Sequence, residues 1–161
     1  MLSSQYTPKD KIKIILAMRD LQKFTCVEFQ SRSNEVDYVY ITSGDGCSSH
    51  LGKIGGQQGI SLHRQGCLSR GTVIHELIHA LGYDHMHSHS ERDKYVQILW
   101  ENIDKNQYDN FEKVSARRFS HFGTSYDYYS LMHYSATAFS KNGKRTIEPK
   151  IKDTKILLDR G

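Results

Sequence analysis

The residues best suited to chemistry lie between positions 75 and 85. His75 and His79 are four positions apart, so on a helix they share one face and both imidazoles reach a single ion. Glu76 points to the side of that ion, where a carboxylate can deprotonate a bound water. Gly82 is expected to end the helix and redirect the chain, bringing His85 to the same ion. The string predicts a zinc site with three ligands and one open position, as in catalytic sites.

These side chains need elements that position them. An apolar set recurs at helical spacing around the histidines and can pack into a core: Val73, Ile74, Leu77, Ile78 and Leu81. A second amphipathic helix is predicted over residues 8–24, with Pro8 near its start and Ile14, Ile15, Met18 and Leu21 on one side. Strands are predicted over residues 36–41 and 60–63 from their β-branched and aromatic residues. Beyond the zinc helix the periodicity fades, so we expect an irregular second half.

Composition and charge exclude some classes of protein for this chain. The chain has 161 residues, 25% of them charged, and a formal net charge of +4, all ordinary for one soluble domain. No stripe of basic and aromatic residues stands out, so we expect no nucleic-acid partner. The longest apolar run near the start, residues 14–18, is too short for a membrane span or a signal-peptide core. We expect no membrane span and a chain that begins after any targeting segment.

The cysteine count of three is odd. Cys47 and Cys67 bracket a stretch rich in Gly, Ser and Gln, and joining them closes a loop of about 20 residues, worth about 3 kcal/mol in the chain-entropy model. They are the obvious pair. Cys26 is left over, as a free buried thiol, an intermolecular bridge, or the partner of a cysteine beyond Gly161.

A second local feature is the run Ser-Leu-Met-His-Tyr at residues 130–134. Met132, in a tight turn beneath the metal, would place a polarisable apolar side chain against the imidazole rings. Tyr134 could lend its phenol to the ion or to a reacting oxyanion. Each residue alone is more typical of core packing. Beside the histidine string, we interpret both as parts of the site.

Together these motifs resemble the astacin family of zinc endopeptidases, a branch of the metzincins that share the extended histidine motif and a methionine turn. Tyr134 separates this resemblance from the matrix and disintegrin-type branches, which lack a tyrosine there. The similarity covers most of the chain: residues 26–29, 37–39, 43–48, 52, 57, 61–62, 66–67, 75–85, 91–96, 128–134 and 139–140.

The resemblance implies an α+β fold, the two-lobed metzincin zincin fold. Its N-terminal lobe would hold a twisted mixed sheet with two helices, a backing helix and the zinc helix. Its C-terminal lobe would be mostly irregular, with the Met-turn. Residues 1–161 would form a single astacin-like catalytic domain, with an upper lobe at 1–86 and a lower lobe at 87–161 that is truncated at the C-terminus.

The resemblance also implies a role for each site residue. The ligands of one Zn²⁺ per subunit would be His75, His79 and His85. Glu76 would be the general base, and Tyr134 a fifth ligand that swings away to bind the transition state. The resemblance also implies a disulfide between Cys47 and Cys67.

The chain departs from the family pattern at several positions. In relatives the cysteine equivalent to Cys26 pairs near the C-terminus, so its partner would lie beyond this chain. Met86 stands where relatives place a glutamate that engages the mature N-terminus, so that ion pair cannot form. His87 and His89 are extra imidazoles that we interpret as solvated loop residues. By similarity to meprin-like members, Lys150 would face the pocket after the scissile bond and favour acidic residues.

The function implied is that of a secreted zinc endopeptidase with an extended polypeptide substrate. A zinc-activated water, deprotonated by Glu76, would attack a peptide carbonyl, and Tyr134 would stabilise the oxyanion. The substrate is expected to add a strand near residues 47–50. Two alternatives are a proteolytically silent zinc-binding fragment acting as a binding module, and a zinc hydrolase with a non-peptide substrate. The oligomeric state is not indicated.

Overall fold

The computed structural model describes residues 1–116, 120, 122–151 and 154–156 of the chain. The chain divides into two units, Met1–Tyr83 and Asp84–Gly161, each with its own hydrophobic core. Gly161, the expected point of truncation, lies outside the described residues.

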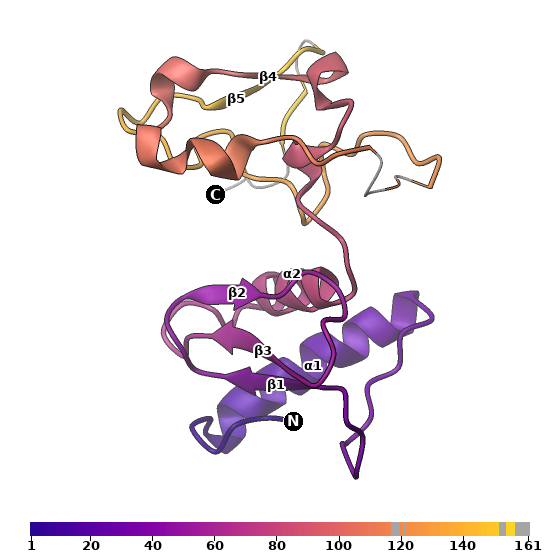
Figure 1. Ribbon diagram of the computed structural model, residues 1–161. Helices are drawn as coiled ribbons and strands as arrows, with labels where there is room; N and C mark the ends of the chain where they lie inside the picture. The colour runs from indigo at the N-terminus through magenta and orange to yellow at the C-terminus, as the bar shows by residue number, and fades with distance from the viewer. Residues whose placement is uncertain (117–119, 121, 152–153, 157–161) are drawn as a thin grey trace. The chain divides into compact units, whose positions relative to one another are not determined.

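A mixed three-stranded sheet organises the first unit (Figure 1). Its strands are β1 (Tyr38–Thr42), β2 (Cys47–Ser49) and β3 (Gln57–Leu62), in the order β1-β3-β2. β1 runs parallel to β3, whereas β2 is antiparallel to it. The mixed sheet confirms the expected fold, but the strands predicted at 36–41 and 60–63 are shifted from β1 and β3. The short strand β2 was not predicted.

Two helices cover this sheet, and both lie behind it in the view of Figure 1. The helix α1 (Pro8–Phe24) has the predicted bounds, and the side chains of Thr7 and Asp10 close a capping box at its start. The helix α2 (Arg70–Ala80) packs against α1, β2 and β3. The shared core has these members from the helices and strands: Ile14, Ala17, Leu21, Ile41, Ile60, Leu62, Val73 and Leu77. Ile15 and Leu81, both expected to pack, are instead exposed.

The cysteines follow the predicted pairing. Cys47 and Cys67 form a disulfide with their Cα atoms 5.5 Å apart. The bond ties the start of β2 to the turn that leads into α2. Cys26 is free and exposed, so the alternative of a buried thiol is wrong.

The second unit is mostly irregular, as expected. Its one described ladder joins β4 (Val96–Ile98) and β5 (Ile147–Pro149) as antiparallel strands. Short 3-10 turns supply most of the rest: Met86–Ser88, Arg92–Lys94, Trp100–Asn102 and Lys105–Phe111. These segments surround a core of Val96, Ile103, Phe111, Tyr126, Ala136, Ile147 and Ile156. Among the described helices of the chain, none has the length and apolar character needed to cross a membrane.

Candidate metal centre

The helix α2 presents the first two predicted ligands. Ser69 caps its N-terminus, because the side-chain oxygen accepts the N–H of Thr72 at 3.1 Å. Helical spacing then places His75 and His79 on one face. Their ring centroids are 4.6 Å apart and the ring planes are nearly perpendicular. His79 is buried and His75 is half-buried.

The end of α2 orients one of these rings. The Nδ1 atom of His79 lies 2.8 Å from the carbonyl oxygen of Tyr83. Because a carbonyl only accepts, Nδ1 carries the hydrogen in this bond, and Nε2 keeps its lone pair for a metal. The carbonyl of His79 itself accepts two N–H groups, from Gly52 at 2.8 Å and Gly82 at 2.9 Å. The turn that redirects the chain is therefore bonded to the ligand helix.

Gly82 makes this turn in the left-handed region, with φ of +101°. Replacing Gly82 by Ala is expected to lower the free energy of unfolding by about 1–3 kcal/mol, because an L side chain is strained at this φ. It should also weaken zinc binding, since the chain between His79 and His85 must shift. Denaturant unfolding and zinc competition with a chromophoric chelator measure the two effects.

The matched control for this substitution is Gly59→Ala in β3, where φ is not positive and an added Cβ would meet nothing within 4 Å. It should leave the zinc affinity unchanged. Equal losses of zinc affinity in both variants would contradict the role given to the turn.

After this turn the third predicted ligand joins the other two. One ligand atom from each of His75, His79 and His85 lies within 4.8 Å of the others. The backbone N–H of His85 donates to the carboxylate of Asp84 at 2.7 Å. Imidazole nitrogen is a common zinc ligand, and three such ligands leave a fourth position open. The donor set therefore fits a catalytic zinc ion.

Glu76 is 5% exposed. Its Oε2 atom has no hydrogen-bond partner among the described residues. Burial raises the pKa of Glu76 to about 7. A buried carboxylate without a partner is unfavourable unless something else binds it, so the orphaned oxygen is consistent with a site that binds a further group.

The predicted methionine turn forms in the second unit. Met132 lies in a turn in which the N–H of His133 donates to the carbonyl of Ser130 at 3.0 Å. Met132 is buried, and its carbonyl accepts the N–H of Met86 at 2.9 Å. The turn thus holds the segment that directly follows His85. Met86, the departure from the family pattern, also packs against the core of this unit.

Tyr134 follows this turn and stands beside the third histidine. Its ring centroid is 4.6 Å from that of His85. The carbonyl of Tyr134 is 2.6 Å from Nδ1 of His133, a fully buried histidine whose Nε2 meets the hydroxyl of Tyr126 at 2.6 Å. The backbone of Tyr134 is therefore held by a partly buried hydrogen bond.

Two buried residues of this region escaped the sequence interpretation. His87, expected to be solvated, has an exposed fraction of 0%. Arg92 is 4% exposed, and its guanidinium donates to the carbonyls of His87 and Phe111. The sequence feature that could have indicated the buried Arg92 was the charged run at residues 91–94. Such a run is equally typical of an exposed surface segment. His89 is half-buried, so the expectation of a solvated residue is only partly met.

Lys150 directly follows β5, and its Nζ atom donates to the carbonyl of Asp93 at 2.5 Å. Its expected role in substrate preference stays a prediction.

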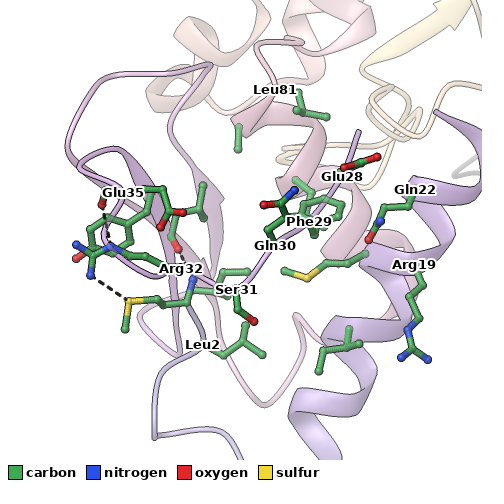
Figure 2. Close-up of a pocket in the computed structure, with 18 of the residues that line it drawn as sticks. Leu2, Arg19, Gln22, Glu28, Phe29, Gln30, Ser31, Arg32, Glu35 and Leu81 are labelled. Carbon is green, nitrogen blue, oxygen red and sulfur yellow. Dashed lines mark hydrogen bonds between the residues drawn. The ribbon is translucent and has the colours of Figure 1, made fainter. Parts of the chain in front are cut away.

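A cavity of about 710 Å³ lies elsewhere in the first unit (Figure 2). It is lined by α1, by the segment 28–32 and by the end of α2. None of the predicted site residues contributes to its lining. The cavity is therefore separate from the histidine cluster.

Comparisons with known proteins agree with this geometry. The sequence model of the peptidase family described as Astacin matches residues 1–159. Zinc metalloproteinase nas-13 of Caenorhabditis elegans is 47% identical over 156 residues, which are 96% of this chain and 34% of that protein. The low choriolytic enzyme of Oryzias latipes is 42% identical, over 92% of this chain and 54% of that protein. The chain thus spans between a third and about half of the length of these curated relatives.

A solved structure has the same fold. High choriolytic enzyme 1 of Oryzias latipes, described as a hatching enzyme zinc-protease, superposes with a TM-score of 0.93 at 40% sequence identity. The match covers 100% of this chain and 80% of that chain. The expected α+β metzincin fold is thereby confirmed.

Proposed function

Because the chain belongs to the astacin family of peptidases, we propose that it is a zinc-dependent endopeptidase. The observation that carries this proposal is the convergence of three imidazole ligand atoms within 4.8 Å, from a helix that also bears Glu76. Residues 1–161 would act as one catalytic domain.

Each residue of the site has a proposed role. His75, His79 and His85 would hold one zinc ion, which when bound would supply Lewis-acid activation of the attacking water. Glu76 takes a proton from that water and passes it to the leaving amine. The support for this role is its buried, unpartnered oxygen. Tyr134 donates its phenolic hydrogen to the developing oxyanion, supported by its place beside His85.

The proposed substrate is an extended polypeptide. β2 is an edge strand of the sheet, paired among the described residues with β3 alone. The open edge of β2 offers backbone N–H and C=O groups to which an extended chain can add as a further strand. Cys47 and Ser48 on this strand are exposed, which keeps the edge accessible.

The proposed location is extracellular. The disulfide between Cys47 and Cys67 forms in oxidising compartments and is rare in the cytosol. Two of the relatives are named as choriolytic enzymes, and one of these is described as a hatching enzyme.

The test is cleavage of an unfolded polypeptide such as reduced and alkylated casein. We expect mass spectrometry to find cuts at internal peptide bonds, all abolished by 1,10-phenanthroline and restored by added zinc. Internal cuts distinguish an endopeptidase from an exopeptidase. A folded protein that binds zinc in a 1:1 ratio and leaves casein intact would instead favour the silent binding module.

A further inference from the structure

The second unit buries an imidazole that the proposed mechanism does not use. His87 is fully buried, and its Nε2 atom lies 2.9 Å from the carbonyl oxygen of Asn110. Since the carbonyl accepts, Nε2 carries the hydrogen. Nδ1 is then an acceptor, and it has no hydrogen-bond partner among the described residues. An unpaired buried acceptor lowers the stability of the folded protein. An apolar side chain at this position would avoid that cost. We therefore look for a role of this imidazole other than filling space in the core.

The flat face of this ring lies against Tyr134. The two ring centroids are 3.8 Å apart and the planes are 24° from parallel, which is a stacked arrangement. The other described aromatic contacts of Tyr134 are looser. Its centroid is 4.6 Å from that of His85, where the ring planes are tilted, 5.5 Å from that of Phe139 and 5.9 Å from that of Phe111. Among the described aromatic contacts of Tyr134, the one with His87 therefore has the shortest distance between ring centroids.

The stacked imidazole is itself held in place. The bond to Asn110 fixes the plane of the ring, because rotating the ring about its bond to Cβ would break that bond. The guanidinium of Arg92 fixes the backbone beneath it by donating to the carbonyl of His87 at 3.1 Å. Arg92 also donates to the carbonyl of Phe111. A side chain anchored at both its ring and its backbone is a rigid support.

We propose that His87 is a positioning residue for Tyr134, a planar side chain tied to Asn110 that sets the orientation of the phenol. This rests on the proposed function, in which Tyr134 stabilises the oxyanion. A phenol that is free to rotate loses part of that stabilisation, because a donor acts on a developing charge only when it is aligned in advance.

The test compares two substitutions of His87. His87→Leu keeps the apolar volume but removes the planar face and the donor. His87→Gln keeps both, because its amide is planar and its Nε2 atom can donate to Asn110. We expect kcat to fall by about tenfold for His87→Leu and by less than about threefold for His87→Gln. KM and zinc content should stay unchanged in both variants.

A double-mutant cycle separates positioning from general damage. In the Tyr134→Phe background, His87→Leu should lower kcat by less than about twofold, because the hydroxyl that it positions is already absent. Val96→Ala, at a fully buried position in the core of the same unit, is the control for loss of stability. Its effect on kcat should be the same in both backgrounds. Equal losses for His87→Leu with and without the Tyr134 hydroxyl would overturn the proposal.

A second readout does not depend on activity. The ring-proton NMR signals of Tyr134, identified by their absence from Tyr134→Phe, should show the ring-current shift of a stacked imidazole. His87→Leu should remove that shift, whereas Val96→Ala should leave it in place. Unshifted signals in the unsubstituted protein would overturn the positioning proposal even if the enzyme cleaves casein. The shift together with an inactive protein would refute the proposed function but leave the stacking intact.

Discussion

Replacing Glu76 by Gln is expected to lower kcat/KM for peptide hydrolysis by about 10²–10⁴-fold, the range for loss of a general acid–base group. The amide has nearly the same shape as the carboxyl but cannot take a proton from the attacking water. Glu76 is not one of the three clustered ligands, so the bound zinc should stay at one ion per chain. The measurements are steady-state cleavage of a quenched peptide and metal analysis of the same sample.

The matched control for this substitution is Glu101→Gln, which makes the same chemical change at an exposed position. It should leave both readouts unchanged. The assignment of Glu76 as the base would be refuted by a Glu76→Gln variant that is folded, zinc-loaded and as active as the unsubstituted protein.

The second large effect is expected for His79→Ala, which should remove both zinc and activity. His79 is the buried member of the cluster, and its bond to the Tyr83 carbonyl places the hydrogen on Nδ1, which leaves the Nε2 lone pair available for a metal. Loss of a supporting group behind a ligand typically costs 10–100-fold in metal affinity, so loss of the ligand itself should cost at least about 100-fold. Competition with a chromophoric chelator measures that affinity.

His63→Ala serves as the control for His79→Ala. His63 lies on the turn that follows β3, and its Nδ1 atom is 3.1 Å from the carbonyl oxygen of Gln65. It does not belong to the cluster, so its removal should not change zinc affinity. If His79→Ala kept its zinc at chelator concentrations that His63→Ala withstands, the three-histidine site would be wrong.

Local signals account for what the sequence predicted well. The helix α1 begins at a proline that follows a threonine cap, and the histidine helix carries its ligands, its apolar face and its terminal glycine within a few turns. Each of these signals depends on neighbours in the sequence. The disulfide was predictable because one pair of cysteines brackets a stretch rich in Gly, Ser and Gln.

Non-local pairing accounts for what the sequence did not predict. β1 pairs in parallel with β3, and β2, which lies between them in sequence, takes the far edge of the sheet. No local pattern encodes that order. The burial of His87 likewise depends on Asn110, 23 positions further along the chain. Residues 86–92 look like a polar surface loop until that distant carbonyl is in place.

The free thiol after α1 has a practical consequence for labelling. Two of the three cysteines are joined to each other, and Cys26 is exposed. Under non-reducing conditions a maleimide dye should therefore attach at Cys26 alone within residues 1–161, provided that this thiol is not bridged to a second chain or to a cysteine beyond Gly161. That position is two residues before Glu28, which lines the cavity in Figure 2. A fluorophore there would report on occupancy of the cavity, while the imidazole cluster stays chemically unmodified.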